Sequence, residues 1–124
     1  MGVPAEGDTI EIRGLRLLCN VGVTAEERAV AQPVEVDLDL SVDLSTAAST
    51  DSVSDTVDYG AVAVAVADAV RGEHALLEHL AAVAADAAMA VDARTSAVVV
   101  AVRKLRPPVP LDVASTGVRL HRRR

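Results

Sequence analysis

The feature that most restricts the fold is a regular alternation of apolar and polar residues over positions 34–44. Every second residue in this segment is Val or Leu, and the residues between them are four acids and one serine. Side chains of a β-strand point alternately to opposite faces, so a period of two predicts a strand with one apolar and one acidic face. The apolar residues are Val34, Val36, Leu38, Leu40, Val42 and Leu44. Such a strand needs a sheet whose apolar face is covered by other elements.

Three further segments are predicted as strands. In residues 9–18, isoleucines alternate with polar residues before the phase shifts at Gly14, which is typical of a β-bulge. The valine-rich residues 98–102 indicate a buried strand, and residues 113–121 form a fourth strand after a proline-rich break. Residues 20–33 are long for a hairpin connection, so this link is a candidate for function.

Two helices are predicted between the second and third strands. Asp58 is a suitable N-cap for a helix over residues 59–71, which Gly72 ends. Apolar residues at helical spacing predict a second helix over residues 75–91. Residues 45–56, rich in Ser, Thr and Asp, are interpreted as a polar connection.

The order β-β-α-α-β-β predicts a single α+β domain over residues 1–124. In such a domain a four-stranded antiparallel sheet carries two helices on one face. Its end strands expose unpaired backbone groups, which pairing with neighbouring subunits would remove. Hydrophobic residues make up 51% of the chain, but there is no Phe or Trp. Because Ala, Val and Leu each remove little area from water, we expect subunit association to supply part of the stability.

Charge and cysteine content argue against several classes of protein. The net charge of −6 argues against general nucleic-acid binding. Residues 94–124 hold eight bases and one acid, or +7, which leaves −13 on residues 1–93. This split indicates either anion steering or subunit pairing, or only a solvated surface. With Cys19 as the sole cysteine, no signal-peptide pattern and only a short apolar stretch at 61–70, we expect a cytoplasmic protein without membrane contact.

Two residues are each the only one of their kind. Lys104 is the only lysine, beside 11 arginines, and Tyr59 is the only aromatic residue. A lysine amine can act as a base when its pKa is lowered, whereas a guanidinium effectively cannot, and a tyrosine hydroxyl can deliver a proton. Both residues are therefore candidates for acid–base chemistry, and chance retention of a packing residue is the competing interpretation.

The acidic residues and histidines leave other interpretations open. Glu78, near the start of the second helix, is either a favourable charge in a first turn or a carboxylate that binds a guanidine-like group. Glu26 and Glu27 lie in the long link, where a glutamate is usually only solvated. The three histidines and Cys19 match no metal-ligand spacing, and Cys19 has no evident partner base. The sequence also has no Gly-rich phosphate loop and no dinucleotide fingerprint, so we expect neither a metal nor an organic cofactor.

Several short segments together resemble the dihydroneopterin aldolase family over about residues 8–124. In chain order they are Asp8-Thr9-Ile10-Glu11-Ile12-Arg13-Gly14-Leu15, Gly22-Val23-Thr24-Ala25-Glu26-Glu27-Arg28 with Gln32, Asp55-Thr56-Val57-Asp58-Tyr59, Leu76-Leu77-Glu78, and Val102-Arg103-Lys104 with Pro107-Pro108-Val109-Pro110. Their order and spacing carry the resemblance.

The resemblance implies a tunnelling fold, in which four subunits close a barrel and two such rings stack into a homo-octamer. It also implies pockets between neighbouring subunits and a pterin substrate. The reaction would cleave 7,8-dihydroneopterin into 6-hydroxymethyl-7,8-dihydropterin and glycolaldehyde, a step of folate synthesis, with 2′-epimerase as a side activity. By position, Glu78 would bind the amino-pyrimidine edge of the pterin, and backbone groups of Leu77 and Val57 would help to hold the ring.

The resemblance also assigns the proton transfers. Glu27 would lie near the side-chain hydroxyls of the substrate. Lys104 would drive proton transfer through a water molecule, and Tyr59 would move protons to and from the intermediate. The sole lysine and the sole tyrosine of the chain thus fall on the two proton-handling positions of the family.

Three departures from the family pattern adjoin the implied pocket. Val21-Gly22 replaces the His-Gly of many relatives, Ala31-Gln32 replaces Gly-Gln, and Leu111-Asp112 replaces Gly-His. These departures affect whether the side chain of the substrate is cleaved or epimerised more than they affect binding of the pterin ring. Two alternatives therefore stay open: a pterin epimerase or other pterin-modifying paralogue, and a non-catalytic pterin-binding or assembly subunit. A zinc-dependent relative similar to pyruvoyl-tetrahydropterin synthase is disfavoured.

Overall fold

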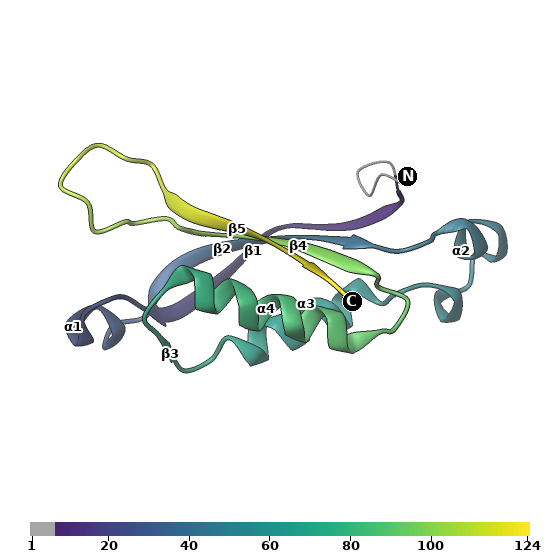
Figure 1. Cartoon of the computed structure of the whole chain (residues 1–124), viewed down its shortest axis with the longest axis horizontal. Helices are drawn as coiled ribbons and strands as arrows, with labels where there is room; N and C mark the ends of the chain where they lie inside the picture. The colour runs from purple at the N-terminus through teal and green to yellow at the C-terminus, as the bar shows by residue number, and fades with distance from the viewer. Residues whose placement is uncertain (1–6) are drawn as a thin grey trace.

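The computed structural model of the chain describes residues 7–124. The strands are β1 (Thr9–Val21), β2 (Gln32–Ser41), β3 (Glu73–His74), β4 (Ala97–Lys104) and β5 (Thr116–Arg123). The helices are α1 (Ala25–Arg28), α2 (Ser45–Thr50), α3 (Tyr59–Ala69) and α4 (Leu77–Val91), with a 3-10 turn, η2 (Val53–Asp55). Figure 1 shows the long strands crossing above α3 and α4, with α1 and α2 at opposite ends of the molecule.

The strands form one curled, mixed sheet in the order β3-β1-β2-β4-β5. As predicted, β1, β2, β4 and β5 pair in antiparallel fashion. The prediction of only four strands is wrong, because Glu73 and His74 pair in parallel with Asn20 and Val21. Two residues produce no periodic pattern, so β3 leaves no signal in the sequence.

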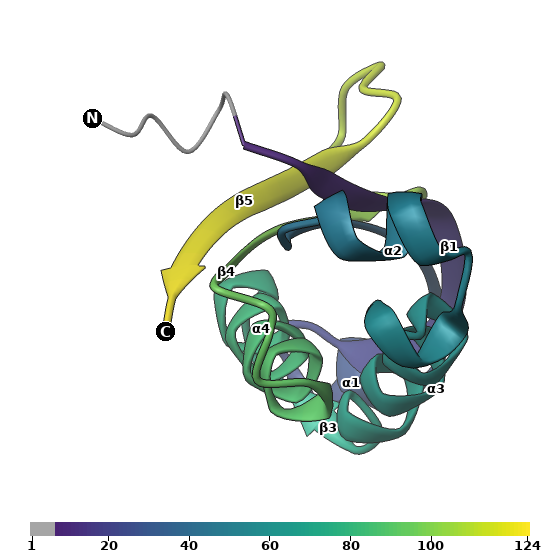
Figure 2. The same cartoon turned by 90° about the vertical axis from the view of Figure 1, so that its right-hand side faces the viewer.

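The alternation in β2 places its apolar residues in the core, as predicted. Helices α3 and α4 pack against each other and lie opposite the concave side of the sheet, which Figure 2 shows end-on. The residues that fill the space between them are small: α4 buries four alanines completely, and β4 buries three valines. The fully buried residues of β2 are Val34, Val36, Leu38 and Leu40. The core is therefore an Ala, Val and Leu core that the two predicted helices cover from one side.

The acidic face of β2 is neutralised by arginines of both neighbouring strands. Arg103 of β4 binds Glu35 and also Asp37, the latter at 3.0 Å. Arg16 of β1 binds Glu35 at 3.0 Å. The hydrogen bond from Arg103, followed by that from Arg16, holds the pKa of Glu35 below its usual value. The polar face of the sheet is thus an ion-pair network across three strands.

The helix predictions are confirmed in part. Asp58 caps α3, and its carboxylate accepts hydrogen bonds from two backbone N–H groups of the first turn at 2.9 and 3.2 Å. Helix α3 ends at Ala69 and α4 begins at Leu77, each two residues inside the predicted bounds. The segment 45–56, predicted as a polar connection, contains α2 and η2. Helix α2 has no side-chain cap, so its start left no sequence signal.

None of the helices within residues 7–124 has the length and apolar character needed to cross a membrane. The longest of them, α4, has 15 residues.

Gly14 produces the predicted bulge in β1. The register between β1 and β2 shifts between Ile12 and Leu15, and Gly14 has φ = 69°. Its backbone N–H donates to Oδ1 of Asp37 at 2.8 Å. A residue without Cβ adopts this left-handed conformation without steric penalty. The bulge bends β1 where the sheet curls.

We predict that Gly14→Ala lowers the free energy of unfolding by about 1–2 kcal/mol, because the new Cβ meets the steric penalty of a left-handed backbone. Gly14→Asn is the matched control, since asparagine tolerates this conformation better and should lose less. Urea denaturation measures both variants at equal protein concentration. An alanine variant as stable as the wild type would contradict the strain assigned to this position.

Candidate active site

Lys104 is the last residue of β4 and lies on the helix-covered side of the sheet. The strand alternates buried and half-buried residues, and Lys104 follows Val98, Val100 and Val102 on the buried face. It is 8% exposed, and its Nζ lies 3.7 Å from Oε2 of Glu27. A buried ammonium needs such a partner, because an isolated charge is strongly unfavourable away from water. The structure thus brings together two of the residues predicted for catalysis.

Glu27 is held in place by the capping box of α1. The backbone N–H and the hydroxyl of Thr24 donate to Oε1 of Glu27 at 3.3 and 3.2 Å, and the Glu27 N–H donates back to Oγ1 of Thr24 at 3.2 Å. The hydrogen bond from the Thr24 backbone is the main cause that lowers the pKa of Glu27, and the Thr24 hydroxyl and Lys104 add to it. Glu27 therefore keeps its charge to lower pH than an ordinary glutamate.

The loop that carries Glu27 folds tightly against the end of β1. A Cβ added to Gly22 would lie 2.2 Å from Cβ of Glu27, so this position needs glycine. Nε2 of Gln32 donates to the carbonyls of Val21 and Glu27 at 2.7 and 3.1 Å. Arg28 donates to the carbonyls of Gly22 and the following residue at 3.0 and 2.9 Å. These hydrogen bonds hold the backbone of the loop in place and so keep the Glu27 carboxylate close to Lys104.

These roles of Gln32 and Arg28 were not predicted from the sequence. Both residues lie in the segment that matches the loop of the family, but they act by satisfying backbone carbonyls. The length of the segment 20–33 could have indicated such roles. A connection longer than a hairpin leaves backbone carbonyls unpaired, and side-chain donors must satisfy them. Val21, one of the departures from the family pattern, is 1% exposed and packs in the core.

The first turn of α4 lies at the same end of the sheet as Lys104. Strand β3 pairs with the end of β1 and leads into α4, whose first residues are Leu77 and Glu78. Strand β4 also ends here, because Lys104 is opposite Val34, the partner of Leu17 in β1. Figure 1 shows α1, β3 and the start of α4 together on this side. Glu78 is exposed, so its carboxylate is available to a ligand.

Tyr59 and Val57 lie at the opposite end of the helical layer. The segment before α3 is tied to the far end of α4, where the Ser54 carbonyl accepts a hydrogen bond from Arg94 at 3.0 Å. Helix α3 has 11 residues and so is about 16 Å long. At the other end of α3, the carbonyl of Val70 accepts a hydrogen bond from His74 of β3 at 3.0 Å. Tyr59 is 66% exposed and Val57 is buried. One chain therefore does not bring these two residues to Lys104.

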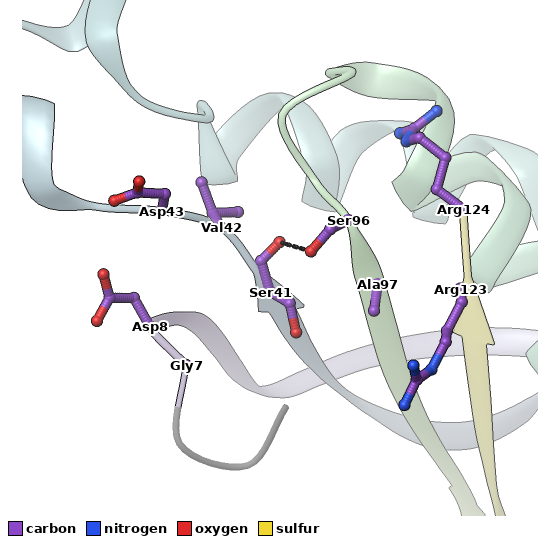
Figure 3. Close-up of a pocket in the computed structure, with 9 residues that line it drawn as sticks. All are labelled: Gly7, Asp8, Ser41, Val42, Asp43, Ser96, Ala97, Arg123 and Arg124. Atoms are coloured by element: carbon purple, nitrogen blue, oxygen red, sulfur yellow. Dashed lines mark hydrogen bonds between the residues drawn. The ribbon is translucent and has the colours of Figure 1, made fainter. Parts of the chain in front are cut away.

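A pocket of about 590 Å³ opens at this second end of the sheet (Figure 3). None of the residues predicted for chemistry lines it. Its polar groups are partly used within the protein. The Ser96 hydroxyl donates to the Ser41 carbonyl at 3.2 Å, and the Arg124 guanidinium donates to the carbonyls of Asp92 and Thr95, just after α4. The lining residues are Gly7, Asp8, Ser41, Val42, Asp43, Ser96, Ala97, Arg123 and Arg124. We therefore do not place the active site in this pocket.

The described part of the chain, residues 7–124, holds no cluster of three His, Cys, Asp or Glu side chains arranged to bind a metal ion.

Three solved structures resemble the chain over nearly their whole length. A putative dihydroneopterin aldolase from Vibrio cholerae has a TM-score of 0.88 at 27% identity, covering 96% of this chain and 99% of that one. Escherichia coli dihydroneopterin aldolase in complex with neopterin has a TM-score of 0.84 at 28% identity, covering 93% and 98%. Dihydroneopterin aldolase from Burkholderia thailandensis, bound to guanine, has a TM-score of 0.77 at 28% identity, covering 97% and 93%. No curated protein sequence matches the chain at a significant level.

The family model of dihydroneopterin aldolase (FolB) matches residues 10–121. This match spans the loop of Glu27, both ends of the helical layer and the strand of Lys104. The chain therefore belongs to the dihydroneopterin aldolase family.

Proposed function

We propose that this protein is a cytoplasmic dihydroneopterin aldolase of folate synthesis, a carbon–carbon lyase that works without a cofactor. Family membership supports this proposal, as do the neopterin and guanine bound by two similar structures, since both molecules carry an amino-pyrimidinone edge. The observation that carries it is the position of Lys104. The sole lysine of the chain is buried at the end of β4, with its ammonium 3.7 Å from the carboxylate of a capped glutamate. General acid–base catalysis needs a titratable group held in this way.

The proposed reaction needs groups that move protons. In 7,8-dihydroneopterin the C6=N5 bond of the ring is an imine next to the trihydroxypropyl side chain. Removal of the 2′-hydroxyl proton lets the C1′–C2′ bond break, and its electron pair moves into the imine as glycolaldehyde leaves. Protonation of C1′ then gives 6-hydroxymethyl-7,8-dihydropterin. If the aldehyde recombines through its other face before it leaves, the product is the 2′-epimer, so both activities share one intermediate.

The residues at the end of the sheet that carries Lys104 bind the pterin and transfer the protons. The Glu78 carboxylate accepts two parallel N–H bonds from the amino-pyrimidinone edge, and the backbone of Leu77 helps to hold the ring. Glu27 lies near the hydroxyls of the side chain. Lys104 transfers the proton through a water molecule. Binding in this orientation removes the entropic barrier to bringing substrate and proton-transfer groups together.

Tyr59 and Val57 complete the proposed site from a neighbouring copy. They are at the far end of the helical layer of their own chain, so only an assembly can place them beside Lys104. The order of the sheet leaves β5 and the first part of β1 as edges with unpaired backbone groups, which a second copy can pair. We propose a tunnelling-fold homo-octamer of two stacked four-subunit rings, with one pterin site at each seam.

Product analysis tests the proposed reaction. Purified protein incubated with 7,8-dihydroneopterin should release glycolaldehyde and 6-hydroxymethyl-7,8-dihydropterin in equal amounts, because one bond cleavage produces both. Chromatography of the pterins and a carbonyl assay measure the two products. Accumulation of the 2′-epimer without glycolaldehyde would support the epimerase alternative. Pterin binding without either product would support the non-catalytic one.

We predict that Lys104→Arg lowers kcat by about 10²–10⁴-fold, the usual contribution of a general acid or base, while pterin still binds. Arginine keeps the positive charge beside Glu27, but a guanidinium cannot give up its proton. Steady-state kinetics and neopterin titration separate the two effects. The control is Arg103→Lys on the opposite face of β4, which should keep near-normal turnover. Normal kcat in the Lys104→Arg variant would refute the proposed role of the amine.

A further inference from the structure

His74 connects three parts of the molecule at the Lys104 end. The residue is 5% exposed, and its Nε2 lies 3.0 Å from the carbonyl oxygen of Val70, directly after α3. Its backbone carbonyl accepts a hydrogen bond at 2.9 Å from the N–H of Gly22, in the loop that carries Glu27. Its Nδ1 lies 2.9 Å from Nδ1 of His79 in the first turn of α4. One buried residue thus links the end of α3, the loop and the start of α4.

The partners of the two rings determine which nitrogens carry protons. A backbone carbonyl only accepts, so Nε2 of His74 carries a proton and the neutral ring accepts at Nδ1. His79 must then donate from its own Nδ1. The pair is therefore a directional link, with His79 as donor and His74 as acceptor.

The first turn of α4 has no side-chain cap. The residue before the helix is Leu76, which offers no hydrogen-bonding side chain, and no cap hydrogen bond is present. The first backbone N–H groups of a helix have no partner within the helix, so the turn gains little order from its own hydrogen bonds. The bond from His79 ties this turn to β3. Leu77 and Glu78, the proposed pterin-binding residues, belong to the same turn.

We propose that His79 is a positioning residue that, by donating to His74, fixes the first turn of α4 and the Glu78 carboxylate against the loop of Glu27. This inference rests on the proposed role of Glu78 in pterin binding. Lys104 and Glu27 are held by contacts of their own, so loss of the histidine link affects affinity and leaves the proton transfers intact.

Two substitutions separate the hydrogen bond from the presence of a side chain. The His79→Leu variant cannot donate, although leucine is a better helix former than histidine. The His79→Asn variant keeps an N–H donor, although asparagine is a poorer helix former than leucine. In the leucine variant we expect KM for 7,8-dihydroneopterin and Kd for neopterin to rise about tenfold, the order expected for one lost positioning bond, with kcat within about twofold. The asparagine variant should recover most of the affinity.

Glu78→Ala separates failure of this inference from failure of the proposed function. Wild-type protein that binds no neopterin would contradict the proposed function, and it would also contradict the predicted effect of His79 on pterin affinity. If the wild type binds, the Glu78→Ala variant does not, and the leucine variant binds like the wild type, His79 has no positioning role. Equal losses in the leucine and asparagine variants would contradict its role as donor.

Hydrogen exchange without ligand tests the link independently of any substrate. Amides of residues 80–83, whose helical acceptors are the carbonyls of residues 76–79, should exchange faster in His79→Leu than in the wild type, whereas His79→Asn should keep the wild-type protection. Unchanged exchange in the leucine variant would overturn the inference whatever the protein binds.

Discussion

The register of β2 between its two neighbours determines where the chemistry of this chain can lie. Val34 is opposite Leu17 of β1 and Lys104 of β4, so the ends of three strands meet at one edge of the core. A slip of one residue would turn the apolar face of β2 outward and its acids inward, which the core would not tolerate. The same holds for β4, because a slip of one residue would move its buried valines out of the core. Lys104 follows them in phase and therefore lies on the helix-covered side, next to the loop that carries Glu27.

The long helical layer divides the candidate site residues between the two ends of the molecule. Lys104, Glu27 and Glu78 lie at one end, and Tyr59 lies at the other, separated by the length of α3. No local rearrangement of side chains can bridge such a distance within one chain. We propose that each chain contributes one part of the site at each end, and that the interface between two subunits joins the two parts into a complete active site. Assembly would then bury sheet edges and create the active site in one step.

Much of the fold follows from local patterns, because alternation and capping act over a few residues. The strand period of β2, the bulge at Gly14 and the cap at Asp58 are of this kind, and the structure confirms all three. Strand β3 is too short to have a period, and its pairing depends on a crossover through α3. The bonds of Gln32 and the pair of His74 and His79 join residues whose proximity only the tertiary structure determines. The separation of Tyr59 from Lys104 depends on the directions of whole elements, which sequence spacing does not contain.

Hybrid oligomers test the shared seam most directly. Lys104→Ala and Tyr59→Phe chains should each be nearly inactive when expressed alone. When they are co-expressed and mix at random, about a quarter of the seams should join the intact Lys104 of one chain to the intact Tyr59 of its neighbour. The co-expressed protein should regain a corresponding fraction of wild-type aldolase activity, while a mixture of separately purified variants without subunit exchange should not. Co-expressed hybrids no more active than either variant alone would show that Lys104 and Tyr59 do not share a site across neighbouring subunits.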